Sequence, residues 1–298
     1  MIRNKIKAAM IGIAGYIAPR HLKAMKLNNI DLKYSYDISD SVGIIDKYFP
    51  DAEFTTNYSK FKKKISQSVD ILVICSPNYL HKKHIIDGLK CGLNIVCEKP
   101  TVITIEDLNF IEKAQKKYKR IIYTIMQLRY HPEIIKLDKY IKNKKKKNFD
   151  VELTYITSRG NWFYNSWKGS KLKSGGIVFN IGIHLFDILI YLFGNVQELY
   201  VSKLNNKVAE GYIKFKKANV KWVLSTDQKL LSKNRVNRAI KIGKKNYNFS
   251  QGFEKLHNIS YSKIISSQGF KIKDIKGSIQ LCERIYNTPI KKLTKIIK

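Results

Sequence analysis

The sequence predicts an α/β fold in which a doubly wound parallel sheet precedes a second part built from antiparallel strands. Short apolar strands alternate with helical segments as far as residue 128, and this order is typical of a parallel sheet with helices on both faces. From Asp150 onward, apolar and polar residues alternate with a period of two, which indicates antiparallel strands with one solvated face. A chain of 298 residues exceeds the usual size of a single core. We therefore expect two domains, residues 1–128 and residues 129–298.

The first expected strand, Lys7–Ile13, runs into a glycine turn and the start of a helix. Pro19 suits the first turn of a helix, where no N–H is needed. A strand, a glycine turn and a helix start are together typical of a phosphate-binding cradle, although the spacing here is Gly-x-x-Gly-x-x-Ala rather than Gly-x-Gly-x-x-Gly. The residues expected to contact a bound dinucleotide are Gly12, Gly15, Tyr16 and Ile17.

The second expected strand, Asp31–Tyr36, ends at Asp37, about twenty residues past the glycines. An acidic residue at this place hydrogen-bonds the adenosine ribose of NAD. Its charge also repels the 2′-phosphate of NADP, so we expect NAD as the cofactor. The alternative is that Asp37 caps a helix that begins near Ser39. The next segment, residues 42–65, has only a weak pattern.

The third expected strand, Val69–Cys75, is followed by Ser76-Pro77-Asn78 and by a helix that continues to Leu89. His81 and His84 share one face of that helix. No third ligand follows at a metal-binding spacing, and the four cysteines form no Cys-x-x-Cys pair, so we expect neither a metal site nor a disulfide framework. Packing is the plainer interpretation of both histidines. We nevertheless include the following among the expected cofactor-binding residues: Ser76, Asn78 and His81.

The strand Leu93–Cys97 runs directly into Glu98-Lys99-Pro100. Proline lacks the N–H that the next ladder bond needs and biases the residue before it to an extended conformation, so the strand must end with Lys99 at its carboxyl end. Ligands of open α/β sheets bind outside the carboxyl ends of the strands. There, an ammonium group beside a carboxylate can hold a substrate hydroxyl, and we expect Glu98 and Lys99 to contact the cofactor too. A solvated lysine at a strand end is the alternative.

A helix over residues 104–118 and a strand over Arg120–Leu128 complete the expected parallel sheet. Asp107 lies three residues after a threonine, which is typical of a helix N-terminus. Gln127, close to the end of the last strand, joins the expected cofactor-binding residues. The basic run Lys144–Lys147 indicates a surface linker.

Beyond this linker, the segments expected to be strands are Asp150–Ser158, Glu198–Leu204, Gly211–Phe215, Lys221–Thr226 and Arg238–Ile242. A helix over Asn180–Phe193 has no polar face and is therefore expected to be buried. His184 and Asp187 lie on one side of it, either as a hydrogen-bonded core pair or as a histidine presented for catalysis. Helices near residues 253–265 and 273–286 end the chain.

The formal net charge of +33 raises the alternative of a nucleic-acid-binding protein. Only 8 of the 56 basic residues are arginine, the usual reader of bases, and the lysines are scattered. We therefore interpret the charge as a compositional bias with solvated lysines, and we expect no nucleic-acid partner. No uninterrupted apolar run is long enough to span a membrane, and the first residues show no signal-peptide cleavage pattern. We expect a cytoplasmic protein.

Several of these motifs together resemble the Gfo/Idh/MocA oxidoreductase family: Glu98-Lys99-Pro100, His21 after the glycine turn, Gly175-Gly176, and Asn180-x-Gly182-x-His184-x-x-Asp187. The resemblance covers nearly the whole chain. It implies that residues 1–128 form an NAD-binding Rossmann domain. It implies that residues 129–298 form an α+β domain with a large, mostly antiparallel sheet, which binds substrate and forms a dimer or tetramer. The family's catalytic lysine and histidine fall on Lys99 and His184. Asn180 stands where aspartate is common, and because an amide cannot relay a proton, we expect it to orient substrate or cofactor.

Shorter motifs resemble the branch of the family that oxidises UDP-N-acetylglucosaminuronate at C3: Gly15–His21, Leu128–Pro132 and Ser166–Gly169. This implies a 3-keto product for surface polysaccharide (lipopolysaccharide) biosynthesis and reoxidation of NADH by 2-oxoglutarate. The expected substrate-binding residues are Arg129, Tyr130, Arg159, Trp167, Lys168, Asn180, His184 and Arg235. Oxidation of UDP-N-acetylglucosamine itself and another sugar dehydrogenase or ketoreductase activity are the alternatives.

The expected chemistry is removal of a hydride and a proton from a sugar carbinol. His184 is the natural proton acceptor near neutrality, because an ordinary imidazole has a pKa near 6.5. Lys99 would hold the developing oxyanion by its charge. A desolvated lysine can also act as the base, so the sequence leaves these two roles interchangeable.

Overall fold

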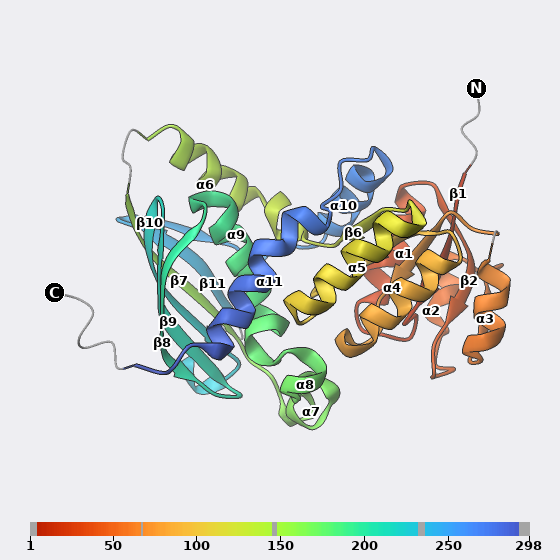
Figure 1. Cartoon of the computed structure of the whole chain (residues 1–298), viewed down its shortest axis with the longest axis horizontal. Coiled ribbons are helices and arrows are strands. Elements are labelled where there is room, and N and C mark those ends of the chain that lie inside the picture. Colours follow the sequence, from red (N-terminus) through yellow and green to blue (C-terminus); the bar gives the residue numbers. More distant parts are fainter. Residues whose placement is uncertain (1–4, 67, 145–147, 232–235, 292–298) are drawn as a thin grey trace. The chain divides into compact units, whose positions relative to one another are not determined.

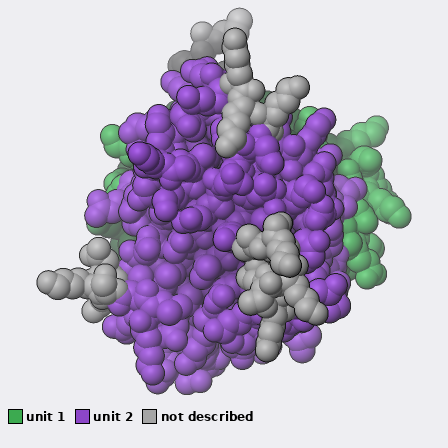
Figure 2. Space-filling view, turned by 90° about the vertical axis from the view of Figure 1, so that its left-hand side faces the viewer, with its two compact units in different colours: residues 1–127, 254–275 green, residues 128–253, 276–298 purple. Residues whose placement is uncertain are grey.

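The structure, a computed structural model, describes residues 5–66, 68–144, 148–231 and 236–291. The chain, shown as a cartoon in Figure 1, forms two compact units, which Figure 2 distinguishes by colour: residues 1–127 with 254–275, and residues 128–253 with 276–298. The sequence-based division had assigned all of 129–298 to the second domain. In the structure, the segment 254–275 belongs to the first unit instead.

The first unit is built on a six-stranded parallel sheet with the order β3-β2-β1-β4-β5-β6, which confirms the predicted doubly wound sheet. Its strands are β1 (Ile6–Ile11), β2 (Ile30–Tyr36), β3 (Glu53–Thr55), β4 (Ile71–Ile74), β5 (Asn94–Cys97) and β6 (Ile122–Thr124). The strand order reverses at β1 and β4. In such sheets this is the place where ligands bind.

Helices of the first unit connect the strands and complete the fold. They are α1 (Ala18–Leu27), α2 (Ile44–Tyr48), α3 (Tyr58–Ile65), η1 (Asn78–Leu80), α4 (His81–Lys90), α5 (Ile105–Tyr118) and α10 (Leu256–Ile265). Pro19 lies in the first turn of α1, as predicted. The Thr104 hydroxyl accepts a hydrogen bond from the Asp107 N–H at 3.1 Å and caps α5. The weakly patterned residues 42–65 contain two short helices and β3, whose brevity explains the weak signal.

Helix α10 packs beside α1 against the parallel sheet (Figure 1). One continuous core contains side chains from the sheet and from both helices, among them Met10, Leu22, Val96, Tyr261 and Ile264. Tyr261 is completely buried there. Burial of each such side chain contributes about 1.5–3 kcal/mol. The returning segment is therefore held to the first unit by the hydrophobic effect.

The second unit is built on a six-stranded, mostly antiparallel sheet with the order β12-β11-β7-β10-β9-β8. Its strands are β7 (Phe149–Thr157), β8 (Val196–Leu204), β9 (Val208–Phe215), β10 (Ala218–Ser225), β11 (Val236–Ile242) and β12 (Lys245–Asn248). The pair β7 and β10 is parallel, which corrects the expectation of antiparallel strands at that place. The period-two pattern reports a half-buried strand but carries no information on the direction of its neighbour.

The apolar helix of the second unit, α9 (Ile183–Phe193), follows a π-helical turn, η4 (Val178–Gly182). Phe186 meets Trp222 of the sheet edge to face, with 5.3 Å between ring centroids. The stretch over residues 171–193 is long and apolar enough to cross a membrane, but 78% of its most apolar window is buried inside the protein. It therefore has the burial of a core helix, as its composition predicted.

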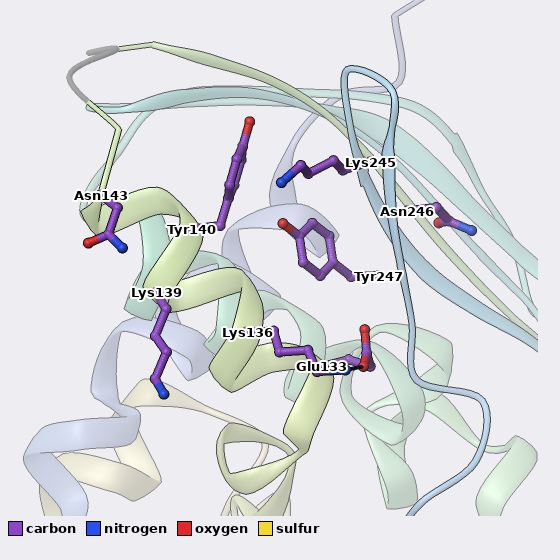
Figure 3. Close-up of a pocket in the computed structure, with 8 residues that line it drawn as sticks. All are labelled: Glu133, Lys136, Lys139, Tyr140, Asn143, Lys245, Asn246 and Tyr247. Carbon is purple, nitrogen blue, oxygen red and sulfur yellow. Dashed lines mark hydrogen bonds and ion pairs between the residues drawn. The ribbon is translucent and has the colours of Figure 1, made fainter.

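The remaining helical segments of the chain are short except for α6 and α11. They are η2 (Gln127–Tyr130), α6 (Pro132–Lys142), α7 (Asn161–Asn165), η3 (Trp167–Gly169), α8 (Lys171–Ser174), η5 (Gln228–Leu230) and α11 (Ile272–Asn287). A cavity of about 460 Å³ lies between α6 and β12 (Figure 3). Its lining residues are Glu133, Lys136, Lys139, Tyr140, Asn143, Lys245, Asn246 and Tyr247. None of the site residues predicted from the sequence lines it.

Candidate active site

The carboxyl ends of the parallel strands bring the predicted cofactor-binding residues to one edge of the first unit. Strands β1, β2, β4, β5 and β6 all run in the same direction, so their carboxyl ends share that edge. The residues that follow these ends are Gly12, Asp37, Ser76, Glu98 and Gln127. Sequence spacing alone had suggested each of them separately, and the sheet topology places them together.

The glycine turn after β1 is tied to the end of β2. Gly12 has a φ of +85°, and a Cβ atom there would lie 2.5 Å from the Cys75 carbonyl carbon, so only glycine fits. The Ala14 N–H donates to Asp37 Oδ2 at 2.9 Å, and the Ser39 N–H donates to Asp37 Oδ1 at 3.1 Å. No helix begins at Ser39 among the described residues, because α2 starts at Ile44. Asp37 therefore holds the turn rather than a helix end.

The residues at this edge fit a bound NAD. A carboxylate has about four acceptor sites, and the two backbone N–H groups on Asp37 leave acceptors for ribose hydroxyls. Gln127 is buried, and its Oε1 has no hydrogen-bond partner among the residues that the structure describes. Tyr16, in the turn, is 84% exposed. A glycine turn before a helix and an acidic residue after β2 are the groups that bind a dinucleotide's pyrophosphate and ribose, and Gln127 Oε1 can accept a further hydrogen bond.

Two histidines of α4 contact the loop after β4, and one of them also contacts the loop after β5. The Ser76 hydroxyl lies 2.8 Å from His84 Nδ1, and burial lowers the pKa of His84 to about 4. His81 is completely buried and has both ring nitrogens next to main-chain carbonyls, those of Pro100 and Ser76. Its ring nitrogens are thus engaged by the protein. These two contacts support the loops, and cofactor contact by His81 stays a prediction.

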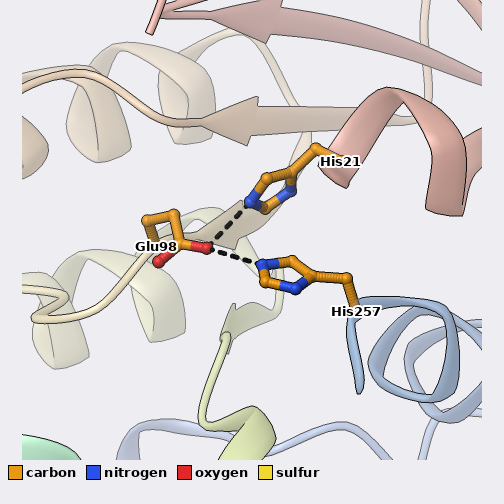
Figure 4. Close-up of side chains that lie close together, drawn as sticks. All are labelled: His21, Glu98 and His257. Atoms are coloured by element: carbon orange, nitrogen blue, oxygen red, sulfur yellow. Dashed lines mark hydrogen bonds and ion pairs between the residues drawn. The ribbon is translucent and has the colours of Figure 1, made fainter. Parts of the chain in front are cut away.

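Glu98 lies at the centre of a buried polar cluster (Figure 4). Its Oε1 accepts hydrogen bonds from His21 Nε2 at 2.8 Å and from His257 Nε2 at 3.2 Å. His21 Nδ1 is 2.8 Å from the Tyr261 hydroxyl. Burial alone would raise the pKa of Glu98, but the bonds from both histidines hold it well below its ordinary value. Glu98 is therefore an anion fixed by the protein, and the second oxygen accepts the Lys99 N–H at 3.2 Å.

The same three side chains also form a group whose ligating atoms lie within 4.8 Å of one another, as in a two-histidine, one-carboxylate metal site. The separations of 2.8 and 3.2 Å are hydrogen-bond lengths. Burial lowers the pKa of His21, which favours a neutral ring that donates from Nε2. Hydrogen bonding therefore accounts for the whole cluster. The sequence did not predict the contact of His257 with Glu98, because the two residues are distant in the chain.

In the second unit, Arg129 and Asp187 form a bidentate ion pair. Arg129 Nε and Nη2 donate to the two Asp187 oxygens at 2.6 Å each. The side chains of Asp187 and Arg129 are 2% and 13% exposed. His184, one turn before Asp187 on α9, is also buried. Two nitrogens of Arg129, which was expected to bind substrate, thus secure α9 next to His184.

A group of cations lies near the end of β7. The Thr157 hydroxyl is 3.3 Å from Arg159 Nη1 and 3.4 Å from Arg238 Nη2. Lys168 Nζ lies 5.1 Å and 5.4 Å from the ring centroids of Trp162 and Trp167. Burial and then the nearby charge of Arg159 lower the pKa of Lys168. We refer to Arg159, Lys168 and Arg238 as the cation cluster.

The remaining predicted substrate residues are less informative. Asn180 lies within the π-helical turn η4, a type of irregularity that is frequent at functional sites. Tyr130 is half-buried at the end of η2. Arg235 lies outside the described residues.

A glycine turn, an acidic residue after β2 and a lysine after β5 on a doubly wound sheet define the first unit as the nucleotide-binding part of a dehydrogenase. The chain belongs to the Gfo/Idh/MocA oxidoreductase family. The family model described as "NAD-binding Rossmann fold" matches residues 6–125, and the model for the "C-terminal alpha/beta domain" matches residues 147–232. The protein is an NAD-dependent oxidoreductase.

Solved structures of the WlbA (WbpB) dehydrogenase from Thermus thermophilus are similar over 96% of both chains. The complex with NAD and alpha-ketoglutarate has 36% identity and a TM-score of 0.93, and the complex with NAD and UDP-GlcNAcA has 35% identity and a TM-score of 0.92. Glucose-6-phosphate 3-dehydrogenase of Bacillus subtilis is 25% identical over 68% of this chain. The matches span 58%, 36% and 38% of the first three curated relatives.

We predict that the wild-type protein prefers NAD to NADP and that Asp37→Ala weakens NAD binding about tenfold or more, because a hydrogen bond to a charged group contributes about 1.5–3 kcal/mol. The Michaelis constants for both cofactors measure this. Asp37→Asn is the control, since it keeps an acceptor for the Ala14 N–H but loses the charge. Equal kcat/KM for NAD and NADP in the wild type would contradict the prediction.

We also predict that Asp187→Ala lowers the free energy of unfolding by about 3–5 kcal/mol, because it leaves the buried Arg129 guanidinium without its carboxylate. Urea unfolding followed by circular dichroism measures the loss. The double variant Arg129→Met with Asp187→Leu should lose less unfolding free energy than the sum of the losses in the single variants Arg129→Met and Asp187→Leu. Glu133→Gln, which breaks the exposed pair with Lys136, is the control and should cost under about 1 kcal/mol. A similar loss from both pairs would rule out a special role for the buried one.

Proposed function

We propose that this protein oxidises the 3-hydroxyl of UDP-N-acetylglucosaminuronate, a UDP-linked N-acetylhexosamine uronate, to the 3-keto sugar. The observation that carries the proposal is the cation cluster of the second unit. The proposal also draws on the Thermus enzyme, which was solved with NAD and UDP-GlcNAcA. In this scheme the first unit binds NAD and the second unit binds the sugar nucleotide.

The cation cluster has the composition of an anion-binding site. Arg159 and Arg238 both reach the Thr157 hydroxyl, so two guanidinium groups of like charge are held near each other. Arg238 Nε is buried and has no hydrogen-bond partner among the described residues. Nor does any described carboxylate lie within 4.0 Å of Arg238 or Lys168. Such an arrangement is destabilising by itself and becomes favourable when an anion binds.

Aromatic side chains around the cation cluster indicate further which kind of ligand it suits. Arg238 lies 4.7 Å from the Tyr155 ring centroid and 5.0 Å from that of Phe253. Trp162, which is 59% exposed, offers a flat apolar face beside Lys168. Charged hydrogen-bond donors next to aromatic faces suit a sugar or uracil ring that carries a carboxylate or a diphosphate. A uronate of a UDP-sugar has all of these groups.

The two proposed catalytic side chains come from different units. When bound, NAD supplies the acceptor for the hydride. The Lys99 ammonium, at the carboxyl end of β5, would stabilise the oxygen as it loses its proton. His184, on α9, would take up that proton, or Lys99 would do so with His184 as the hydrogen-bond donor. Asn180, four residues earlier, would orient the sugar.

The proposal also includes the reoxidation of NADH, the oligomeric state and the pathway of the product. The Thermus dehydrogenase was also solved with alpha-ketoglutarate, and we propose that 2-oxoglutarate reoxidises NADH on the present enzyme. We propose that the protein is a cytoplasmic homo-oligomer, a dimer or tetramer, that covers its open antiparallel sheet. Its product would enter lipopolysaccharide or another surface-polysaccharide pathway after amination.

The test is incubation of the purified enzyme with NAD, 2-oxoglutarate and one of three sugars, with the keto product measured by mass spectrometry. UDP-N-acetylglucosaminuronate should be oxidised at C3. Turnover of only UDP-N-acetylglucosamine would reassign the substrate to the neutral sugar nucleotide. Turnover of only glucose 6-phosphate would move the activity toward that of the Bacillus relative. Turnover of none would reject the substrate class.

We predict that Lys99→Met and His184→Ala each lower kcat by a factor of about 10² to 10⁴, the usual contribution of a positioned acid–base group. NAD binding, measured by calorimetry, should remain within about threefold of the wild type, since both variants keep the glycine turn, Asp37 and Gln127, and Lys99 is only one of the residues expected to contact NAD. A near-wild-type kcat in either variant would remove that residue from the catalytic assignment.

We predict that Lys168→Met and Arg238→Met raise KM for the uronate about tenfold to a hundredfold, because each removes a charged donor worth about 1.5–3 kcal/mol. Methionine keeps most of the apolar stem of both side chains. Lys221→Met, on the exposed part of β10, is the matched control and should change KM little. An equal rise in all three variants would indicate a general effect of net charge instead of a specific site.

A further inference from the structure

The buried carboxylate of Glu98 is the negative charge at the centre of its cluster. His21 donates from Nε2, and its Nδ1 lies beside the Tyr261 hydroxyl, which can donate to it. His257 donates from Nε2, and its buried Nδ1 has no partner among the described residues. The contacts of His21 are satisfied by a neutral ring, and the contact of His257 with Glu98 needs only its Nε2–H. The carboxylate remains charged, and a buried charge is costly unless it has an opposite charge as well as hydrogen bonds.

His81 makes two contacts that only its protonated form can satisfy. Nδ1 lies 2.8 Å from the Pro100 carbonyl oxygen, and Nε2 lies 2.8 Å from the Ser76 carbonyl oxygen. A carbonyl oxygen only accepts hydrogen bonds, and a neutral imidazole has one N–H. With a neutral ring, one bare nitrogen would lie against a carbonyl oxygen at 2.8 Å in a completely buried site.

Two opposing influences act on this ring. Burial lowers the pKa of His81, whereas the carbonyls of Pro100 and Ser76 and the charge of Glu98 raise it. The other titratable neighbour is His84, whose own pKa is lowered by burial and by His81. The hydrogen-bond geometry favours the charged ring, because a neutral ring forfeits one buried hydrogen bond and leaves a carbonyl unsatisfied.

His84, on the same helix, shows the contacts that a neutral histidine makes. Its Nδ1 faces the Ser76 hydroxyl, which donates as readily as it accepts. A neutral His84 therefore satisfies its contact, in agreement with its low pKa of about 4. His84 faces a hydroxyl oxygen, which can donate, whereas His81 faces two carbonyl oxygens, which only accept. This difference favours a neutral His84 and a positively charged His81.

We propose that His81 is a buried imidazolium that balances the charge of Glu98 and clamps the loops after β4 and β5, and thereby positions Lys99. Its two hydrogen bonds join Ser76, in the loop after β4, to Pro100, which directly follows Lys99. Glu98 fixes the same residue from the other side by accepting the Lys99 N–H. His81 is thus a positioning residue, and its effect on turnover rests on the proposed catalytic role of Lys99.

The charge can be tested without any activity. The full-length protein, labelled with ¹⁵N in its six histidines, is studied by long-range ¹H–¹⁵N NMR at neutral pH. Both His81 nitrogens should have the signature of protonated nitrogen, whereas His84 should show one protonated and one bare nitrogen. Resonances are assigned by substitution of His81 and, by elimination, of the other five. One bare nitrogen on His81 would overturn the proposal.

The clamp is tested by His81→Gln, Glu98→Gln and the double variant. His81→Gln should lower kcat about tenfold or more with KM for NAD nearly unchanged, because the glutamine keeps a donor but loses the charge and one hydrogen bond. The double variant should lose less folding stability than the two single losses added together, since it removes both charges. Strictly additive losses, or an unchanged kcat in an active His81→Gln enzyme, would overturn the clamp. If no variant folds, the spectrum of the wild type still decides the charge.

Discussion

The buried carboxylate of Glu98 is the constraint on which the first unit depends. A carboxylate that is 7% exposed must receive several hydrogen bonds, and two of its donors come from opposite ends of the chain. His21 lies 77 residues before Glu98, and His257 lies 159 residues after it. The chain leaves the first unit at residue 127 and returns at residue 254. The return brings the second donor and, in Tyr261, a buried side chain for the core.

The sequence predicted the elements of the fold better than their partners. Apolar runs bounded by glycine or proline identified β1, β4 and β5, because strands of a parallel sheet are buried on both faces. The parallel pairing of β7 with β10 and the assignment of α10 to the first unit were missed. Both depend on which distant surface covers an element, and local periodicity carries no information on that.

The candidate site shows the same division between local and distant information. The places of Asp37 and Lys99 at strand ends followed from spacing, because a strand end is a local feature. The ion pair of Arg129 with Asp187 joins residues 58 positions apart, and residue type alone could not identify that pair; substrate binding by Arg129 stays a prediction. The hydrogen bonds of two arginines to the Thr157 hydroxyl could not be predicted for the same reason. Functional residues were therefore predictable where a single segment of the chain contains the whole motif.

The cations behind the net charge of +33 differ in their surroundings. Carboxylates are scarce, at 23 against 56 cations, and several lysines lie over tyrosine rings, such as Lys83 over Tyr58 at 4.9 Å and Lys245 over Tyr140 at 4.3 Å. Exposed cations of this kind are solvated and need no ligand. Arg238 differs, because its Nε is buried without a described partner. A buried nitrogen without a described partner, more than the number of charges, therefore distinguishes Arg238 from the other cations.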